Sequence, residues 1–544
     1  MDTLGMTQTN RVEFHPIPKA GYSLLDRLPT GHSRSGIPTR NFVQLEYIED
    51  YIRRSDLSPL APRSVAVENH YIDRDYMADY GVFFSSLLCP PSNHCQRLHF
   101  FAAEPAFVED ELVKLGNLLP QSDEAYRDRC AEFSRKYYLG FSVIRPLPGC
   151  PVGRTVLRLL PSQKEDGAQR ILTCTRNYDV NFMGVLLGIQ GLAFQQQDLA
   201  VSRCATIALW SALNITSARE SITIPTPVEI TKHASQTQLP FGRQMPSEGL
   251  SCGQMCFALQ SVGVPPFLLK ATGLVQTRQL IFASVNSGMP CVLLIHKATN
   301  KHLYHAVTVV GMKASPTHAS CLDTFGSVDD LSGDVVALYV HDDRIGPYRR
   351  ADIVSRADDD GLWLSIGTKS HRPNEEPEEW RVDQVIIPSH AKIRVGFNEL
   401  ESLARIWVVP NIQGAIAIMD KIEERRTQQS GFPWPWKKKK TAPTLQFKTW
   451  IERGHKYIQR VLSEQLLSDS VLFRKECVLP RYLAVMRFGG ESFGQIDVLV
   501  DTTTPKPNYR LIGIVALNGS DPKGETRRFI ADHLAKKYQC KHWQ

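Results

Sequence analysis

The chain has 544 residues, of which 42 % are hydrophobic and 22 % are charged, the composition of an ordinary globular protein. The chain is too long for a single hydrophobic core, and its length predicts about three domains. Each would be large enough to fold without stabilisation by disulfides or metal ions. The formal net charge of +7 is a mild basic bias, compatible with an acidic partner, and it excludes neither an enzyme nor a binding protein.

No segment of the sequence reaches the ~20 apolar residues that a membrane-spanning helix needs. The longest apolar stretch, Val185–Phe194, is interrupted by Gly188 and Gln190. The first residues lack the basic region and apolar region of a secretory signal. The 12 cysteines are scattered, many in apolar surroundings, which favours a reducing compartment. We therefore expect a cytoplasmic protein without a membrane partner.

The N-terminal part of the chain is predicted to contain a lead-in and one domain. Residues 1–41 are rich in Pro, Gly, Ser and Arg, which indicates a loosely ordered segment. In residues 42–168, the apolar spacing over 45–52 predicts an amphipathic helix, and 97–101 and 141–146 indicate short strands. We expect an N-terminal α+β domain of unknown role.

The C-terminal part, residues 391–544, is expected to form another α+β domain. A basic linker, 431–443, interrupts it, with proline alternating with tryptophan before the run Lys437–Lys440. Such a run would suit nucleic acid or anionic lipid, but it is more often a solvated linker, so nucleic-acid binding is not expected. The apolar patterns predict helices over 397–408, 415–426, 448–467 and 526–538 and strands over 482–488, 495–500 and 509–516.

The middle part, residues 169–390, carries the strongest chemical signals. After Ser202, a candidate N-cap, apolar residues recur at helical spacing. Cys204 then lies in the first helical turn, where free N–H groups and the helix dipole favour thiolate over thiol. Cys204 is therefore a candidate nucleophile, and a buried structural cysteine is the alternative. The apolar stripe consists of Ala205, Ala208, Leu209, Ala212 and Leu213.

Three strands are predicted downstream, over 288–295, 304–312 and 336–341. His305 opens the second strand and Asp342 directly follows the third. A histidine at the start of one strand and an acid at the end of the next can lie side by side in an antiparallel pair. A cysteine nucleophile needs such a histidine base and a group that orients its ring. The alternatives are a strand-end histidine and an ordinary Asp-rich turn.

The span from about 194 to 346 combines these features: glutamine before a helix-borne cysteine, a Gly-x-Pro strand, a His-Ala-Val-x-Val strand and an acid after the next strand. It resembles papain-like cysteine peptidases, closest to their C39-like branch. The resemblance implies an α+β multi-domain protein with a central papain-like domain that hydrolyses peptide bonds without metal or cofactor. Carried over by position, it implies Cys204 as nucleophile, His305 as base, Asp342 as orienting acid and Gln197 as oxyanion donor.

The sequence departs from the family at the oxyanion donor. The family glutamine usually lies six residues before the cysteine, and here that position is Asp198, which in its ionised form has no proton to donate. The loop would carry one extra residue, and Gln196 is an alternative donor to Gln197. Cys252, at the start of another predicted helix, is a weaker candidate nucleophile.

Other polar clusters have less specific explanations. His302 competes with His305 as base, but only His305 opens the buried strand. The cluster Cys89, His94, Cys95 and His99 does not have the spacing of a zinc knuckle, so no metal is expected. The acidic segment 71–76 with Arg97 and Arg154 would make a charged pocket or, more commonly, a surface ion-pair network.

Three functions remain open from the sequence. The first is a cysteine peptidase that cleaves a peptide or isopeptide amide of a protein or peptide substrate through an acyl-enzyme. The second uses the same triad for deamidation or acyl transfer, because the attack on the amide is identical. The third is an inactive papain-like scaffold that binds a peptide or protein. The flanking domains are expected to bind a partner protein.

Overall fold

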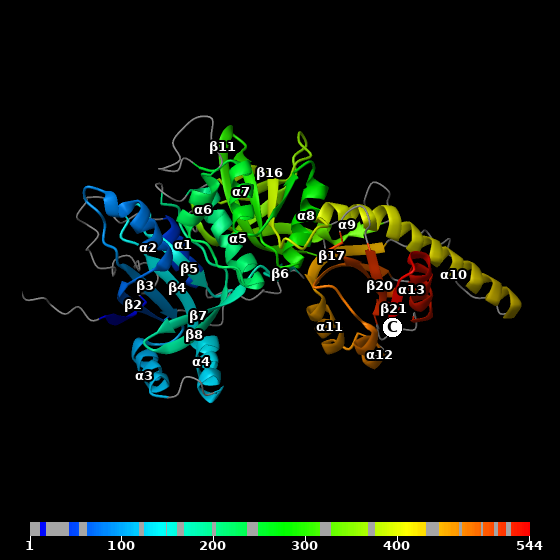
Figure 1. Ribbon diagram of the computed structural model, residues 1–544, viewed down its shortest axis with the longest axis horizontal. Helices are drawn as coiled ribbons and strands as arrows, with labels where there is room; N and C mark the ends of the chain where they lie inside the picture. Colours follow the sequence, from blue (N-terminus) through cyan, green and yellow to red (C-terminus); the bar gives the residue numbers. More distant parts are fainter. Residues whose placement is uncertain are drawn as a thin grey trace, which may run out of the picture.

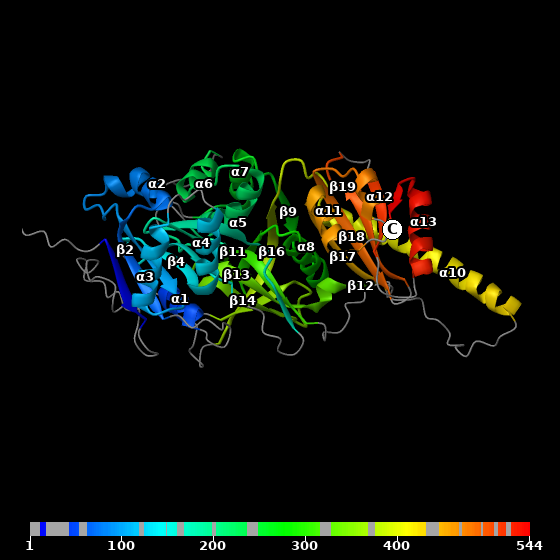
Figure 2. The same ribbon diagram turned by 90° about the horizontal axis from the view of Figure 1, so that it is seen from below.

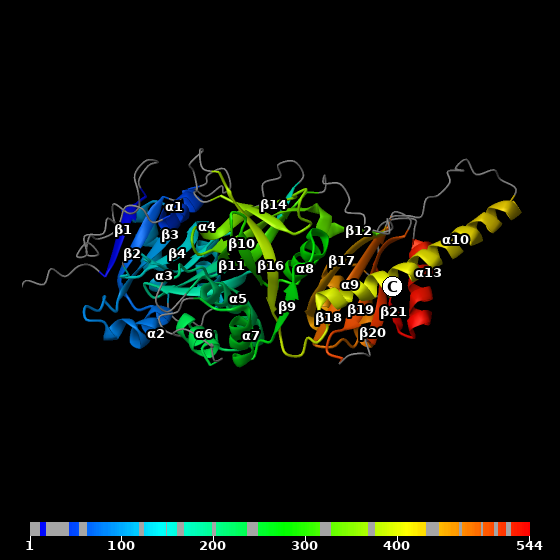
Figure 3. The same ribbon diagram turned by 90° about the horizontal axis from the view of Figure 1, so that it is seen from above.

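The computed structural model describes residues 11–17, 43–53, 63–118, 124–147, 149–159, 168–198, 203–236, 249–315, 328–367, 376–430, 445–466, 470–490, 493–504, 510–517 and 524–543. Helices and strands are mixed along this chain, and the three larger of its four described β-sheets follow one another along the long axis of the molecule (Figure 1). The views from below and from above show the same succession (Figures 2 and 3). The predicted α+β class is therefore confirmed.

The N-terminal body is a five-stranded antiparallel sheet with helices and a β-hairpin packed on it. Its elements are β1 (Val12–Pro16), β2 (Ser64–Tyr71), α2 (Arg74–Val82), β3 (Cys95–Phe101), α3 (Pro105–Gly116), α4 (Glu124–Tyr137), β4 (Tyr138–Ile144), β5 (Val152–Leu157), β7 (Arg176–Phe182) and β8 (Val185–Gly191). Strand β1 pairs with β2, so part of the predicted loosely ordered lead-in is in fact a strand of this sheet.

The hairpin of β7 and β8 belongs to the N-terminal body, beyond the predicted boundary at residue 168. Its two strands alternate buried and less buried residues, and its turn, Met183-Gly184, has positive φ at both residues, as a two-residue hairpin turn requires. The ring of Phe182 stacks on His99 of β3, with ring centroids 4.0 Å apart. The chain therefore enters the central body after this hairpin, apart from one short strand that precedes the hairpin.

The central body is built on an eight-stranded sheet that closes on itself. Its elements are β6 (Gln169–Ile171), α5 (Cys204–Glu220), α6 (Pro227–Ala234), α7 (Cys252–Ser261), β9 (Pro266–Lys270), α8 (Leu274–Asn286), β10 (Cys291–Lys297), β11 (Asn300–Ala314), β13 (Val335–Asp342), β14 (Gly346–Val354), β15 (Trp363–Ile366) and β16 (Glu378–Pro388). Neighbouring strands are antiparallel in the order β10, β11, β13, β14, β15, β16, and β16 pairs back with β10. The three strands predicted around His305 and Asp342 correspond to β10, β11 and β13, but β11 begins at Asn300, so His305 opens the buried part of this strand and not the strand itself.

Helix α5 is the buried helix of the central body. The sequence predicted one apolar stripe, but every residue from Ala205 to Ser217 is buried. The sheet covers one side through β11, where the Thr308 hydroxyl donates to the Ala208 carbonyl at 2.8 Å, and α6 and α7 also pack against the helix. This enclosure fixes the position of the helix end that carries Cys204.

Helix α1 (Val43–Arg53) joins the N-terminal and central bodies. It was predicted as the first helix of the N-terminal domain, but it also packs on β14 of the central sheet. The rings of Tyr51 and Tyr348 lie 5.5 Å apart, and a side chain at Gly346 would overlap the ring of Tyr47. The two bodies therefore share packed residues at this predicted domain boundary.

The C-terminal body is a six-stranded sheet flanked by helices. Its elements are β12 (Val328–Asp330), α9 (Phe397–Leu403), the π-helical turn η5 (Ala404–Val408), α10 (Val409–Ser430), β17 (Leu445–Arg453), α11 (Gly454–Ser463), α12 (Ser470–Glu476), β18 (Tyr482–Gly490), β19 (Gly494–Asp501), β20 (Arg510–Leu517), α13 (Gly524–Tyr538) and β21 (Lys541–Trp543). Strand β12 comes from the segment between β11 and β13 and pairs in parallel with β17. The sheet is thus completed by a strand from outside the predicted 391–544 domain, and the predicted linker 431–443, with Lys437–Lys440, lies outside the described residues.

Two sequence predictions in the C-terminal body need correction. The predicted helix over 448–467 is wrong in its first part, because β17 continues to Arg453 and α11 begins at Gly454. Buried Leu445 and Phe447 flank exposed Gln446, which is the period of a strand. The helices predicted over 397–408 and 415–426 are parts of one continuous helical run.

This helical run bears on the prediction that the protein has no membrane partner. Phe397–Arg426 is, in the described part of the chain, the one helix long and apolar enough by length and composition to cross a bilayer. Its most apolar window is 39 % buried, and Leu400, Ala404 and Ile412 have no exposed surface. A core helix has the same composition, so these features are weak evidence for a membrane segment.

Candidate active site

The candidate nucleophile, Cys204, is the first residue of α5 and is half-buried. The N-cap is Arg203, whose side chain makes no capping hydrogen bond, while the predicted N-cap, Ser202, lies outside the described residues. The first backbone N–H groups of a helix have no partner within the helix, and the helix dipole is positive at this end. The predicted placement of Cys204 in the first turn is confirmed.

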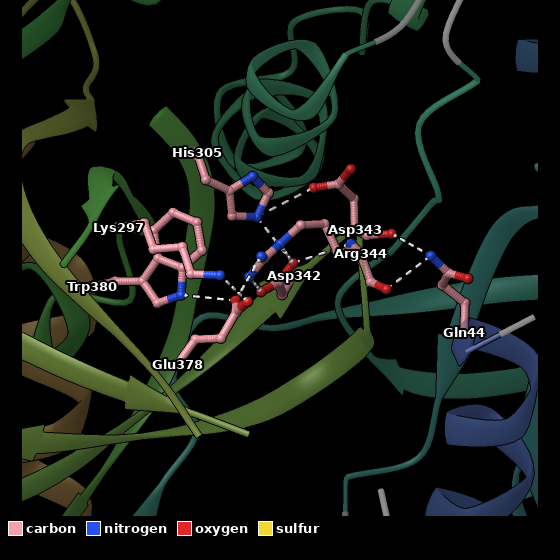
Figure 4. Close-up of polar contacts among 8 residues, drawn as sticks. All are labelled: Gln44, Lys297, His305, Asp342, Asp343, Arg344, Glu378 and Trp380. Carbon is pink, nitrogen blue, oxygen red and sulfur yellow. Dashed lines mark hydrogen bonds and ion pairs between the residues drawn. The ribbon is translucent and has the colours of Figure 1, made fainter. Parts of the chain in front are cut away.

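His305 and Asp342 come together as the strand order predicted. Strands β11 and β13 are antiparallel neighbours, with Thr308 opposite His341. His305 Nε2 lies 2.9 Å from Asp342 Oδ1, and both side chains are buried (Figure 4). This contact occupies Nε2 and leaves Nδ1 of the ring for another partner. Exposed His302 lies outside this arrangement.

The electrostatics of the pair favour an imidazolium and a carboxylate. Burial by itself lowers the pKa of His305, but the charge and hydrogen bond of Asp342 and a side-chain interaction with Cys204 raise it to about 10. Burial raises the pKa of Asp342, and the charges of His305 and Arg344 outweigh it and hold the pKa well below its ordinary value. The buried ion pair therefore places a cation beside the thiol of Cys204.

The next two residues, Asp343 and Arg344, complete the polar turn after β13. The Arg344 guanidinium donates to Asp342 at 2.8 Å and 3.1 Å, and its backbone N–H donates to the same carboxylate at 3.0 Å. Asp343 lies 3.6 Å from His305 Nε2, yet its carboxylate oxygens have no hydrogen-bond partner among the described residues. Burial raises the pKa of Asp343 to about 6.

A carboxylate on β16 connects the site to the neighbouring strands. Glu378 accepts from Lys297 at 2.5 Å, from Arg344 at 3.0 Å and from the Trp380 indole N–H at 3.2 Å (Figure 4). The Trp380 ring lies 5.8 Å from the His305 ring, and Arg344 lies over its face at 4.6 Å. Glu378 and Trp380 thus fix the guanidinium that holds Asp342, and Trp380 packs beside His305.

The N-terminal part of the chain also supports this turn. Gln44 of α1 donates to the backbone carbonyls of Asp343 at 3.0 Å and Arg344 at 2.9 Å (Figure 4). These carbonyls belong to the turn that follows Asp342. The conformation of the turn therefore depends on a helix that is about 300 residues earlier in the sequence.

The candidate oxyanion donors lie on the segment before α5. The side chain of Gln196 accepts from Val152 N–H at 3.2 Å and donates to the Gly149 carbonyl at 3.3 Å, so it is engaged in the N-terminal body. Gln197 is half-buried and Asp198 is buried. Residues 199–202, which connect them to Cys204, lie outside the described residues. Of the two glutamines considered, Gln197 is the one whose amide is not held by these contacts.

The same histidine and acids could also be considered as metal ligands, which the sequence did not predict. One ligand atom each of His305, Asp342 and Asp343 lie within 4.8 Å of one another. Arg344 already contacts both oxygens of the Asp342 carboxylate, and a metal cation there would be repelled by the guanidinium. The residues present therefore fit an ion pair better than a metal centre.

The other sequence candidates do not assemble into a comparable site. In the cluster for which no metal was expected, Cys89 is exposed, whereas His99 is buried and lies 2.9 Å from the Tyr138 hydroxyl. Asp75 and Arg154 do form an ion pair of 2.6 Å, but Asp75 is buried, so this is not the expected surface network. Cys252 begins α7 and its thiol partner is Cys256.

Arg344, Glu378, Trp380 and Gln44 are the site residues that sequence reasoning missed. Arg344 directly follows the Asp342-Asp343 pair and could have been considered from that proximity alone. The other three come from distant parts of the chain and carry no local motif. A comparison of the chain with protein-family models and with curated proteins found no match.

Proposed function

We propose that the central body is a papain-like cysteine peptidase domain that cleaves a peptide or isopeptide amide. The observation that carries the proposal is the arrangement around His305: Asp342 occupies Nε2 at 2.9 Å, and the ring interacts with Cys204 at the start of α5. Acyl transfer to a thiol needs a nucleophile beside a base whose ring is oriented by an acid.

In the proposed mechanism, His305 acts from Nδ1 while Asp342 keeps the ring oriented. The Cys204 thiolate attacks the carbonyl carbon of the amide, and its sulfur forms the acyl bond. His305 gives its Nδ1 proton to the leaving amine, and the C–N bond breaks. His305 then takes a proton from water, whose oxygen attacks the thioester; the C–S bond breaks, the acid is released, and the thiolate and the protonated His305 are restored. Gln197 is the proposed donor to the oxyanion.

The contacts around the triad support the ionised state that this mechanism uses. Arg344 holds Asp342 as a carboxylate, so Asp342 can stabilise the imidazolium of His305. The eleven described cysteines are free, which suits the reducing cytoplasm proposed for the protein. The substrate class is a protein or peptide, and the flanking bodies are proposed to bind partner protein. Deamidation or acyl transfer would use the same attack with another acceptor.

A second candidate, an inactive peptide-binding scaffold on the same frame, rests on the segment before the nucleophile. Asp198 lies at the position where a donor is expected, and the Gln196 amide is held by Val152 and Gly149. If Gln197 does not supply the missing donor, the loss of one oxyanion donor would cost roughly 10²–10³ in turnover. The two candidates are separated by the reactivity of Cys204.

The test is labelling of the full-length protein with an electrophilic peptide probe, followed by mass spectrometry of each cysteine. Wild type, Cys204→Ala and His305→Gln are compared at pH 7.5. Cys252 is an internal control, since it also begins a helix, is half-buried and has a pKa lowered by its hydrogen bond with Cys256, but it lacks a histidine–acid pair.

A peptidase site predicts rapid labelling of Cys204 in wild type, slow labelling of Cys252, and loss of the difference in His305→Gln. Circular dichroism and the thermal midpoint of each variant report whether the fold is retained. Equal, slow labelling of Cys204 and Cys252 in wild type would contradict the enzyme and favour the binding scaffold.

A further inference from the structure

A large cavity lies between the central and C-terminal bodies, away from Cys204. Its volume is about 760 Å³, and it is lined by the last turn of α5, the turn before β10, the segment after β16, and β17, β18 and α11. Because α5 begins at Cys204 and ends at Glu220, with a rise of about 1.5 Å per residue, the cavity lies roughly 25 Å along the helix from the thiol. It is therefore separate from the candidate active site.

The wall of this cavity carries an excess of positive charge. Three glutamates, Glu220, Glu452 and Glu464, line it together with six lysines and arginines. The six cationic residues are Arg219, Lys448, Arg453, Lys456, Arg460 and Arg487. The histidine of the wall, His390, adds a seventh basic group.

Three of these cations have carboxylate partners. Arg460 lies 2.7 Å from Glu452, and Arg453 lies 3.4 Å from Glu220. Arg487 makes two hydrogen bonds with Asp497, at 2.7 Å and 2.8 Å. These pairs hold part of the wall in place and neutralise half of its cations.

The other three cations face the cavity without a carboxylate. In the described part of the chain, Arg219, Lys448 and Lys456 have no acidic oxygen within 4.0 Å. Arg219 donates to the Ser287 carbonyl at 3.2 Å, a neutral acceptor. Lys448 and Lys456 come from the C-terminal body and Arg219 from α5, so both bodies present to one space cations that have no direct ion-pair partner.

Three cationic side chains of this wall lie around the indole of Trp450. Lys448 Nζ lies 5.6 Å from the ring centroid, and the guanidinium groups of Arg460 and Arg487 each lie 5.2 Å from it. An aromatic face attracts cations, and like charges around one ring repel one another. Carboxylates pair with Arg460 and Arg487, so Lys448 is the member of this group without a direct ion-pair partner. Burial and the charge of Arg487 both lower the pKa of Lys448. A bound anion would relieve this repulsion.

We propose that this cavity binds a small phosphate-bearing metabolite of nucleotide size, whose phosphate oxygens contact Lys448, Lys456 and Arg219. Lysine and arginine make strong charge-assisted hydrogen bonds with phosphate. The volume lies within the range of small-molecule sites, roughly 300–1,000 Å³, and a cavity of this size does not admit a folded protein or a nucleic-acid duplex. The ligand would join the C-terminal body to the helix that carries the candidate nucleophile.

Isothermal titration calorimetry on the full chain at low salt tests this site with four probes: ATP, pyrophosphate, adenosine and tetraglutamate. We expect ATP and pyrophosphate to bind, with an affinity that falls as salt is raised. Adenosine, which lacks phosphate, is expected not to bind. Tetraglutamate carries charge without phosphate, and it is expected to bind at least tenfold more weakly than ATP.

Variants on the two walls locate the binding. Lys448→Gln combined with Lys456→Gln removes two charges from the C-terminal body, and Arg219→Gln removes one from α5. Each is expected to weaken ATP binding at least tenfold, as the loss of a charge-assisted hydrogen bond does. Lys537→Gln is the matched control, because Lys537 is exposed on α13 and does not line the cavity.

Three results would overturn the proposal. They are failure of both ATP and pyrophosphate to bind wild type, binding unchanged in both wall variants, and tetraglutamate binding as tightly as ATP. A variant that fails to fold is recognised by its circular dichroism spectrum, and the variant on the other wall then decides. Labelling of Cys204 plays no part in this test, so its outcome is independent of the peptidase proposal.

Discussion

Asp342 and Asp343 are adjacent buried carboxylates that should respond in opposite ways to the same substitution. Asp342 is held by His305 and Arg344, whereas the oxygens of Asp343 have no hydrogen-bond partner among the described residues. Asp342→Asn removes one partner of a buried ion pair and is expected to destabilise the central body by about 3–5 kcal/mol at pH 7.5. Asp343→Asn removes a buried carboxylate whose burial outweighs the attraction of His305, 3.6 Å away, and it is expected to stabilise the central body.

The expected gain for Asp343→Asn follows from its pKa, which burial raises from 3.8 to about 6. Such a rise corresponds to a cost of about 3 kcal/mol when the carboxyl is ionised. Because the pKa is raised in the folded state, full stability is present below pH 3.8 and is lost as the pH rises through about 6. The advantage of asparagine should therefore be absent near pH 3.8, grow up to about pH 6 and stay constant above it.

Differential scanning calorimetry of wild type and the two variants between pH 4 and pH 8 measures these effects. For a body of 150–250 residues, each kcal/mol shifts the thermal midpoint by about 2–4 °C. The pKa of Asp342 is held well below its ordinary value, so its contribution is present above pH 3.8 and is lost only at lower pH, and the cost of Asp342→Asn should stay nearly constant between pH 8 and pH 4. Equal destabilisation by both variants at pH 7.5 would refute the assignment of Asp342 as the hydrogen-bonded acid and of Asp343 as the acid without a hydrogen-bond partner.

Three further substitutions test the support around the site. Tyr348→Phe removes the hydroxyl that accepts from the buried Leu192 N–H at 2.8 Å. Urea unfolding should show an unfolding free energy lower by about 1–3 kcal/mol. An unchanged free energy would mean that another acceptor replaces the hydroxyl. In Gly346→Ala the new methyl group would overlap the Tyr47 ring, so the variant should lose about 1–3 kcal/mol of unfolding free energy. Its thermal midpoint should fall and proteolysis of α1 should become faster. The control Gly414→Ala places a methyl group on α10 with no atom within 4 Å, and it should be neutral or stabilising. Arg344→Lys keeps the charge but loses the two-point contact with Asp342. It should lower the unfolding free energy by about 1–3 kcal/mol and slow probe labelling of Cys204. Unchanged labelling would show that Arg344 does not position Asp342.

Local patterns accounted for much of the secondary structure, and they failed where two patterns overlap. The strands around His305 and Asp342 were predictable because their β-branched runs end in polar turns. The part of β17 from Lys448 on was predicted as helix, because its apolar residues continue the helical spacing of α11, and pairing with β18 decided in favour of a strand. The hairpin of β7 and β8 was assigned to the central domain because no sequence pattern states which sheet it packs against.

The sequence by itself placed Cys204 in the first turn of a helix and His305 and Asp342 at the ends of two predicted strands that can pair, because these features follow from local spacing. It did not show that β11 begins before His305, or that β12, between β11 and β13 in the chain, joins another sheet. Only the tertiary structure decided what surrounds these site residues. The closure of β16 onto β10 brings Glu378 and Trp380 to Arg344, and the packing of α1 brings Gln44 to the same turn. Contacts between residues so far apart in the chain depend on how whole sheets and helices pack, and no local spacing encodes that.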